Sequence, residues 1–498
     1  MPRSHLRHAP VRPLVVAAAW VLASCAVGPD YVRPAVEVPA AYREGAGWKT
    51  AQPRPVDSRQ PWWETYGDET LNALVVAANA ANQNIRQAEA QYRQAKALAD
   101  AARAGYFPNV GASVSASRGA SNVTGQDVTS FAAGLSGSWE PDLWGGVRRS
   151  VEAGEAGAAA SADDIAAARL SIQSAVAQDY LQLRYIDIQR ELYADTVVAY
   201  AKALKLTQAQ YAAGVAQRSD VALAQTQLKA AQAQGVDLDA QRSQLEHAIA
   251  ILVGRPPASF TLAAVSPAQS FQARMPAIPA SLPSELLERR PDIAAAERLA
   301  AQANANIGVA KAAYYPALTL SASGAGSAAT FASLFDTPSR IWALGATLAQ
   351  TVFDGGLRRA RTAQAVAVYD VTVAQYKQTV LNGFQQVEDN LATLRVLEQE
   401  TALQDEAVTA ARLAEQLALV QYRGGTASYL GVVTAQTLAL SNQRTAVQLR
   451  SRQLTSSVAL IIATGAGWLP GGDNLAAIAP APSPSSPPTS TASTSSGN

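Results

Sequence analysis

The stretch YFPNVGASVSASRGA at residues 106–120 decides the fold, because it returns as YYPALTLSASGAGSA at residues 314–328. The distance of about 210 residues is far longer than the roughly 20 to 50 residues of a solenoid unit. We therefore predict a duplicated half-protein, with a first repeat at 68–270 and a second at 271–470. Two further motifs recur with similar spacing, Gly145-Gly146-Val147-Arg148-Arg149 with Gly355-Gly356-Leu357-Arg358-Arg359, and Gln210-Tyr211-Ala212-Ala213-Gly214 with Gln421-Tyr422-Arg423-Gly424-Gly425.

Each repeat contains two segments in which apolar and polar residues alternate. In the first of them, Val110, Ala112, Val114 and Ala116 interleave with glycine and serine. Alternation over about ten residues, with one apolar face, is the signature of a transmembrane β-strand. The face of a soluble hairpin shows the same alternation, and the export signal described below favours the membrane. The predicted strands are 108–118, 129–141, 316–325 and 340–353.

Four strands cannot close a barrel by themselves. An open sheet edge is not tolerated in hydrocarbon, because each unpaired backbone group costs several kcal/mol. The smallest barrels have about eight strands and an interior filled by side chains. Two copies of the chain would make such a plugged cylinder, whereas three copies would make twelve strands around an open lumen. The strands therefore predict a homo-oligomer, and a pore favours a homotrimer.

Long helices are predicted to follow each strand pair. No proline occurs from Gly146 to Ala212 or from Gly356 to Arg423, and each stretch would form a rod of roughly 100 Å. Apolar residues recur every seven positions in the row Val366, Val373, Val380, Val387 and Leu394, which indicates supercoiled helices packed side by side. A dimeric cytoplasmic coiled coil would not account for the strands or the duplication. Shorter helices are predicted at about 68–105, 217–253, 284–313 and 428–463.

The N-terminal residues 1–24 resemble an export signal, with basic residues before an apolar run from Leu14 to Leu22. Leu22-Ala23-Ser24-Cys25 is similar to a bacterial lipoprotein cleavage box, in which the cysteine becomes the lipid-modified N-terminus. Cys25 is the one cysteine in the sequence, so no intramolecular disulfide is possible. An ordinary secretory signal with an incidental cysteine is the alternative. We expect an extended linker and equatorial segment at 25–67, and a disordered Pro/Ser/Thr-rich tail at 471–498.

Composition argues against an enzyme and against nucleic-acid binding. The net charge is +1, charged residues make up 16%, and no Lys/Arg run provides an electrostatic footprint for nucleic acid. His247 is the one histidine outside the signal, so catalytic triads and zinc clusters have almost no ligands. We therefore expect no enzymatic activity, no cofactor and no metal. The acidic pairs Asp163/Asp164 and Glu388/Asp389 are interpreted as solvated helix positions.

With these features assembled, the chain resembles bacterial outer-membrane factors of the TolC type, in the lipoprotein branch that serves resistance-nodulation-division efflux systems. The motifs that carry the resemblance are Cys25-Ala26-Val27-Gly28-Pro29-Asp30-Tyr31, Leu287-Glu288-Arg289-Arg290-Pro291-Asp292-Ile293 and Phe353-Asp354-Gly355-Gly356. The resemblance implies an α+β membrane protein, a homotrimer whose twelve-stranded β-barrel continues into a long periplasmic α-helical barrel. It also implies a lipid-anchored location in the bacterial outer membrane, with contacts to a periplasmic adaptor protein and an inner-membrane proton-driven transporter.

The far tip of the assembly is predicted where the long helices turn, at Gly214 and at Gly424-Gly425, because glycine permits a tight reversal. The resemblance implies that these turns contact the adaptor. It also places Asp220 and Tyr422 on residues that link helices at a periplasmic gate, through a carboxylate–phenol hydrogen bond. The residues expected to contact the adaptor are Val215, Ala216, Gln217, Arg218, Ser219, Thr426, Ala427, Ser428, Tyr429 and Leu430.

The second tip departs from the family pattern. Gly431 and Thr434 stand where the family often places aspartates that ring the entrance, and Ala427 stands where some members carry an arginine. We therefore expect a less acidic entrance.

The function that these features favour is a passive trimeric exit duct for drugs or other small toxic compounds, in a tripartite efflux pump. One alternative is the outer-membrane exit of a type I protein secretion system, which would have the same physical form. A second alternative is a lipid-anchored coiled-coil scaffold without a pore. The transported substrate does not follow from the sequence, because outer ducts commonly leave selection to the inner-membrane transporter.

Overall fold

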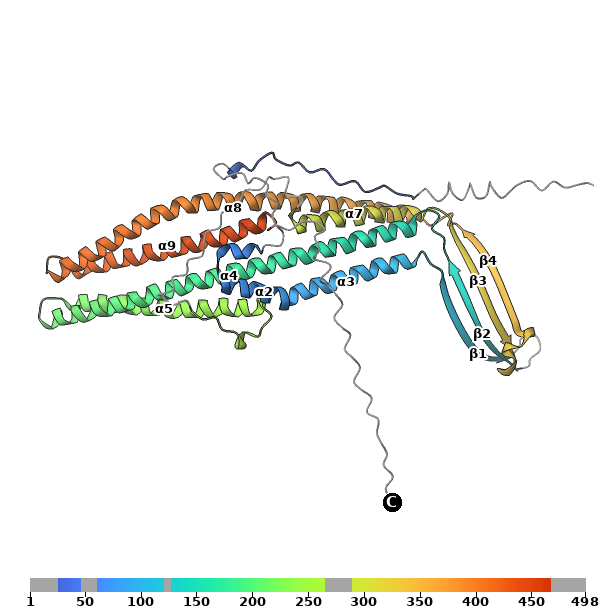
Figure 1. Cartoon of the computed structure of the whole chain (residues 1–498), viewed down its shortest axis with the longest axis horizontal. Helices are drawn as coiled ribbons and strands as arrows, with labels where there is room; N and C mark the ends of the chain where they lie inside the picture. The colour runs from blue at the N-terminus through green and yellow to red at the C-terminus, as the bar shows by residue number, and fades with distance from the viewer. Residues whose placement is uncertain (1–25, 46–60, 121–126, 265–288, 467–498) are drawn as a thin grey trace, which may run out of the picture.

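The computed structural model describes residues 26–45, 61–120, 127–264 and 289–466. Cys25, the signal 1–24 and the tail 471–498 lie outside these residues. The described chain forms a long bundle of helices with a four-stranded sheet at one end (Figure 1). The α-helices are α2 (Glu69–Ala81), α3 (Gln83–Ala104), α4 (Gly146–Ala212), α5 (Arg218–Leu252), α7 (Pro291–Ala312), α8 (Leu357–Arg423) and α9 (Tyr429–Ala463). The short 3-10 helices are η1 (Arg43–Gly45), η2 (Trp62–Tyr66), η3 (Pro257–Ser259), η4 (Ala332–Phe335) and η5 (Thr337–Ser339).

The two longest helices, α4 and α8, have 67 residues each. Each begins directly after a glycine in the left-handed region, Gly145 at φ 77° and Gly356 at φ 92°. The single helix that the sequence predicted over 68–105 is instead two helices, because Asn82 interrupts it. The Asn82 side chain caps α3 by accepting hydrogen bonds from the backbone of Asn84 and Ile85, and it donates to Leu252 O at 2.8 Å.

The sheet is antiparallel, with strand order β1-β2-β3-β4. The strands are β1 (Asn109–Ala120), β2 (Asp127–Trp139), β3 (Ala317–Ala328) and β4 (Arg340–Ala349). In this register Ala112 pairs with Leu135, Leu135 pairs with Gly324, and Gly324 pairs with Trp342, so the apolar positions of all four strands share one face, which also carries Arg340 at the start of β4. We call it the apolar face. Serine and threonine occupy much of the opposite face, and β1 and β4 are the two edges of the sheet.

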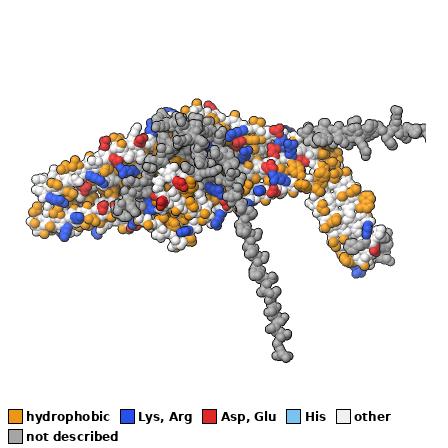
Figure 2. All heavy atoms as spheres, in the orientation of Figure 1, with side chains coloured by type: hydrophobic (Ala, Val, Ile, Leu, Met, Phe, Trp, Pro, Cys, Tyr) orange, Lys and Arg blue, Asp and Glu red, His pale blue; other side chains and the backbone are white. Residues whose placement is uncertain are grey.

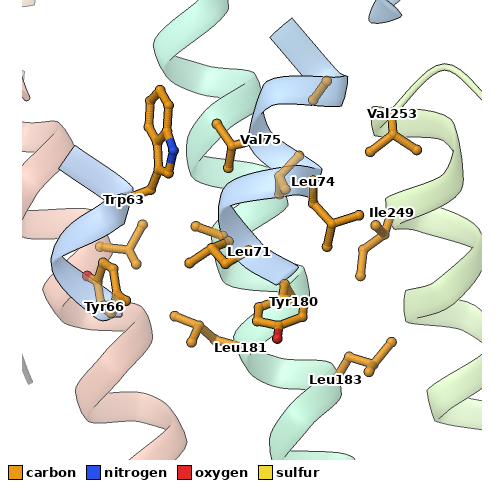
Figure 3. Close-up of a cluster of buried hydrophobic side chains, with 14 of the residues drawn as sticks. Trp63, Tyr66, Leu71, Leu74, Val75, Tyr180, Leu181, Leu183, Ile249 and Val253 are labelled. Carbon is orange, nitrogen blue, oxygen red and sulfur yellow. The ribbon is translucent and has the colours of Figure 1, made fainter. Parts of the chain in front are cut away.

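A core lies midway along the bundle, where η2 and α2 pack against α4, α5 and α9 (Figure 3). Tyr66, Leu71 and Tyr180 are almost fully buried there. The Tyr66 hydroxyl lies 2.8 Å from Ser457 Oγ of α9, and the Tyr180 hydroxyl donates to Asp68 Oδ2 at 2.7 Å. Burying each large apolar side chain contributes about 1.5–3 kcal/mol, so this cluster fixes the middle of the bundle.

The extended residues 26–42 run along α7 and α8 (Figure 1). Gly28 packs so closely on Gly308 of α7 that a Cβ at Gly28 would lie 2.5 Å from Gly308 Cα. Arg149 of α4, which is buried, pairs with Asp30 at 2.7 Å, and Asn304 Nδ2 donates to Pro29 O at 2.9 Å. These contacts hold the segment against the second repeat as well as the first.

Two of the acidic positions that the sequence analysis interpreted as solvated have other roles. Glu388 accepts hydrogen bonds from the backbone N–H groups of Arg43 at 2.7 Å and Glu44 at 2.9 Å, so it binds the start of η1. Asp163 is half-buried between α4 and α7, and burial raises its pKa to about 6. The interpretation as solvated positions was wrong because the segments that cover these side chains, η1 over Glu388 and α7 over Asp163, are distant from them in sequence.

An ion network ties α4, α5 and the residues after η3 together. Asp187 accepts from Arg242 Nε at 2.7 Å and from Arg184 Nη1 at 3.2 Å, and its side chain is 2% exposed. The same arginines donate to backbone carbonyls, Arg184 to Ala263 at 2.7 Å and Arg242 to Leu262 at 2.6 Å. Asp187 therefore neutralises the buried Arg184, and it shares the largely buried Arg242 with Glu246, whose Oε2 lies 3.1 Å from Arg242 Nη1.

Asp187→Asn should destabilise the protein by about 3 kcal/mol, because it removes the counter-charge from the buried Arg184 and leaves Arg242 paired with Glu246 alone. Asp239→Asn is the matched control, since Asp239 also pairs with an arginine of α4, Arg190, but is exposed. The control should cost less than about 1 kcal/mol. Denaturant unfolding followed by circular dichroism measures both values, and equal destabilisation would contradict the role assigned to Asp187.

Asp163→Asn should stabilise the protein above pH 6, on the order of 1 kcal/mol for a half-exposed group. The reason is that burial disfavours the charged carboxylate, so the folded pKa lies above the ordinary value. Wild type regains stability as pH falls through 6, and the difference between the proteins should vanish near pH 4. Unfolding temperatures across pH test this. Asp195→Asn, at an exposed position of α4, should show no such trend.

Candidate functional site

The two helical hairpins, α4–α5 and α8–α9, turn at the end of the bundle that lies farthest from the sheet (Figure 1). We call the residues between these helices, with the first turn of α5 and of α9, the tip. Backbone hydrogen bonds and a left-handed glycine form each turn, and the side chains that the turns expose are available to a partner.

In the first turn, α4 ends at Ala212 and Gly214 adopts the left-handed conformation at φ 78°. Val215 N–H and Ala216 N–H both donate to Gln210 O, at 2.8 and 3.2 Å. The helix α5 then starts with a capping box, in which Gln217 N–H donates to Asp220 Oδ2 at 3.1 Å.

The second turn repeats this geometry. Gly425 has φ 73°, and Thr426 N–H donates to Gln421 O at 3.0 Å. Gly424 has φ −78°, so only Gly425 needs the conformational freedom of glycine. The equivalent position in the first turn is accordingly an alanine, Ala213.

Most of the residues that the sequence placed at the adaptor contact are exposed. Val215 is 74% exposed and Leu430 is 59% exposed. Ala216 and Ala427 are half-buried. Tyr429 is different, because it is 2% exposed and so is not available for such a contact in this structure. The exposed members are Val215, Gln217, Arg218, Ser219, Thr426, Ser428 and Leu430.

The hydrogen bond expected between Asp220 and Tyr422 is absent. The Asp220 carboxylate is the third residue of α5 and is used by the capping box instead. The Tyr422 side chain is 6% exposed, and its hydroxyl has no hydrogen-bond partner among the described residues. The structure thus brings both residues to the tip but does not link them.

Tyr422 belongs to a cluster that joins the two hairpins. Its ring lies 5.1 Å from that of Tyr429, and both pack with Ala224 of α5 and Val432 and Val433 of α9. We call these five residues the tip cluster. Burial raises the pKa of Tyr429, and the nearby Tyr422 and Asp220 add to the shift. The contact between hairpins at this level thus combines apolar packing with a side-chain hydrogen bond between Tyr429 and the buried Thr207 of α4, which opposes the shift in pKa.

Farther from the tip, the contact between the two hairpins buries polar groups that lack hydrogen-bond partners among the described residues. Neither the Tyr200 hydroxyl of α4 nor Gln436 Oε1 of α9 has a hydrogen-bond partner in the part of the chain that the structure describes. Burial raises the pKa of Glu415 of α8, against the opposing effects of its hydrogen bond with Gln436 and the charge of Arg412. Each unsatisfied buried group costs about 1–3 kcal/mol, so this contact between hairpins is weaker than an apolar one.

The entrance side of α9 has few charges. Gly431 and Thr434 are exposed, and no Asp or Glu occurs anywhere from Tyr429 to Ala463. Among the described residues, no group of three or more His, Cys, Asp or Glu side chains could hold a metal ion. None of the helices in that part of the chain is long and apolar enough to cross a membrane.

The sequence analysis missed Tyr200, Glu415, Gln436 and the burial of Tyr429. A signal for Gln436 was present, since it lies seven residues after Tyr429 on the side of α9 that also carries the buried Val432 and Ala439. A polar residue in an apolar heptad row marks a specific interhelical contact.

Comparison with known proteins agrees with this architecture. A family model described as "Outer membrane efflux protein" matches residues 74–255 and 282–466, one segment in each repeat. The chain is 33% identical to the pyoverdine export outer membrane protein OpmQ of Pseudomonas aeruginosa, over 91% of this chain and 96% of OpmQ. It is 29% identical to the toluene efflux pump outer membrane protein TtgC of Pseudomonas putida, over 90% of this chain and 94% of TtgC.

A solved structure of the outer-membrane channel OprN superimposes with a TM-score of 0.82 at 31% identity, over 89% of this chain and 100% of OprN. These similarities confirm the predicted fold class and the predicted location in the outer membrane, and they confirm the resemblance to TolC-type channels. The chain belongs to the outer membrane efflux protein family.

Proposed function

We propose that the chain is a passive exit duct of a tripartite efflux pump and works as a homotrimer. The observation that carries this proposal is the sheet with two open edges. Every residue of β1 and of β4 is exposed, and the apolar positions of all four strands share one face. Such a sheet can stand in hydrocarbon only if β1 pairs with β4 of another copy.

Three copies are proposed because a duct needs an open interior. Two copies would give eight strands, whose interior is just filled by side chains, and three copies give twelve. The face opposite the apolar face carries small and polar residues such as Ser113, Ser136 and Ser321, which suit a water-filled interior.

The tip is the surface proposed to meet a periplasmic adaptor and, beyond it, an inner-membrane proton-driven transporter. Its exposed Val215 and Leu430 provide apolar contacts on otherwise polar turns. Tyr429 supports the tip from inside, because it packs in the tip cluster.

A lipid on Cys25 would act as an additional anchor. Ala26 and Val27 lie at the junction of β2 and α4, where Val27 N–H donates to Trp144 O at 3.1 Å. An acyl chain attached to the preceding residue would start beside the end of the sheet, at the level of the membrane surface. One lipid chain gives only modest affinity, so the barrel remains the main attachment.

The cargo proposed is a small molecule. OpmQ is described as a pyoverdine exporter and TtgC as part of a toluene efflux pump, and both resemble this chain over nearly its whole length. No observation favours type I protein secretion. The scaffold without a pore loses its support, since the family consists of efflux channels.

The purified full-length protein should form ion-conducting pores in planar bilayers and should have the mass of three chains. Deletion of its gene should make cells hypersensitive to small toxic compounds while protein secretion stays normal. An insulating protein would refute the duct, and a secretion defect without hypersensitivity would favour the type I system.

Tyr422→Phe should not increase single-channel conductance. The hydroxyl is buried and unpartnered, so its removal should strengthen the contact between hairpins by about 1 kcal/mol and raise the unfolding temperature. Tyr211→Phe, which removes an exposed hydroxyl near the tip, is the control and should change neither property. A conductance increase in the Tyr422 variant alone would show that its hydroxyl does hold the gate closed.

A further inference from the structure

The end of the bundle opposite the sheet carries an excess of positive charge. We call residues 196–236 and 407–447 the distal segments, which comprise the last seventeen residues of α4 and α8, the two turns, and the first nineteen residues of α5 and α9. They contain seven cationic and two anionic side chains, a net of five positive charges, in a chain whose total is +1. Figure 2 shows Lys and Arg side chains on this end of the molecule. The seven cations are Lys202, Lys205, Arg218 and Lys229 in the first hairpin, and Arg412, Arg423 and Arg444 in the second.

Both carboxylates of the distal segments are already engaged. Asp220 accepts a hydrogen bond from the backbone N–H of Gln217 at 3.1 Å, within the capping box of α5. Glu415 is half-buried and forms a hydrogen bond with Gln436, and its burial raises its pKa and so disfavours the charged form. The excess of five positive charges holds when both carboxylates are ionised, so protonation of Glu415 only increases it.

The distal cations also lack the ion pairs that occur nearer the middle of the bundle. Just outside the distal segments, Arg450 of α9 pairs with Asp405 of α8 at 2.9 Å. Closer to the tip, the corresponding link between α8 and α9 is uncharged on one side, because Arg412 donates to Gln443 Oε1 at 2.8 Å. Among the residues that the structure describes, none of the seven distal cations forms an ion pair with a carboxylate, and all of them except Arg444 are exposed. Their charge is therefore not compensated within the described chain.

Two of these cations stand at the turns themselves. Arg218 is the first residue of α5 and Arg423 is the last residue of α8, and both are exposed. In the proposed trimer, three copies would bring six such arginines to the opening at the end of the helical barrel. Rings of Arg or Lys side chains favour anions in protein pores, because walls of one charge sign concentrate ions of the opposite sign.

We infer that the tip forms an electropositive mouth, which admits small organic anions such as carboxylates into the duct in preference to cations. The inference names a cargo class for the proposed function and rests on it, because only the trimer has a lumen that the mouth could serve.

Contact with an acidic partner protein is the other use that such a charge could have. The extent of the charge favours the small anion. Lys202 lies ten residues before the end of α4, about 15 Å from the turn, whereas the exposed apolar side chains of Val215 and Leu430 are confined to the turns and the start of α9. A contact centred on those apolar side chains would leave much of the charge uncovered.

The reversal potential of the purified full-length protein in planar bilayers measures this preference. In a gradient of potassium chloride near 0.1 M, where the screening length is about 10 Å, wild type should favour chloride over potassium at least about threefold. Benzoate should likewise be favoured over benzylammonium, which has a similar size and the opposite charge. At about 1 M salt the screening length falls to about 3 Å, and both preferences should approach unity.

The double variant Arg218→Gln with Arg423→Gln should lower the preference for chloride at least about twofold, because it removes the charges nearest the opening. Arg218→Lys with Arg423→Lys keeps those charges and should retain the wild-type value. The matched control is Arg93→Gln with Lys96→Gln, which removes two exposed cations from α3, far from the tip. This control should leave the preference unchanged.

The outcomes separate the mouth from the duct. A wild-type protein that conducts without preferring anions would refute the electropositive mouth alone, and a protein that does not conduct would refute the duct and the mouth with it. Unchanged selectivity in the glutamine variant would overturn the role of the two arginines and assign them to contact with an acidic partner. An equal loss of selectivity in the α3 control would show that overall charge, and not the mouth, sets the preference.

Discussion

The need to pair every backbone amide within hydrocarbon underlies the rest of this molecule. Water is absent there, so the strand edges β1 and β4 have no alternative to another strand. The chain provides only four strands, and their register gathers the apolar side chains on one side. In the proposed function, assembly from several copies is therefore a condition of membrane insertion and not an addition to a finished monomer.

The duplication gives each strand pair its own long helical hairpin. Helices α4 and α8 have the same length, and each begins after a left-handed glycine. The two halves differ in the middle of the bundle. There η2 and α2, which precede the first strand pair, pack between α4, α5 and α9 and form the largest core cluster. Figure 3 shows how Tyr66, Leu71 and Tyr180 meet in that cluster. The bundle is thus held firmly at its middle, whereas its tip relies on a smaller cluster and on imperfectly satisfied polar groups.

The sequence predicted the strands and the long helices well because local signals define them. Alternation marks the strands, and glycine with the absence of proline marks the ends and length of α4 and α8. The break at Asn82 was missed, although asparagine is a good helix cap. Glu388 was misread because the N–H groups that it binds lie more than 300 residues away in sequence. The burial of Tyr429 likewise depends on how two hairpins pack, which periodicity within one helix does not reveal.

The residues 26–44 also constrain the order in which the chain can fold. Tyr31 reaches Glu297, Arg33 reaches Tyr376 and Arg43 reaches Glu388, across separations of 266, 343 and 345 residues. These partners belong to α7 and α8, so the surface that receives the segment does not exist until most of the second repeat has been made. Closing such long loops is slow compared with forming hairpins. The segment that begins at Ala26 is consequently among the last parts of the described chain to dock, and α7 and α8 stay uncovered on that side until it does.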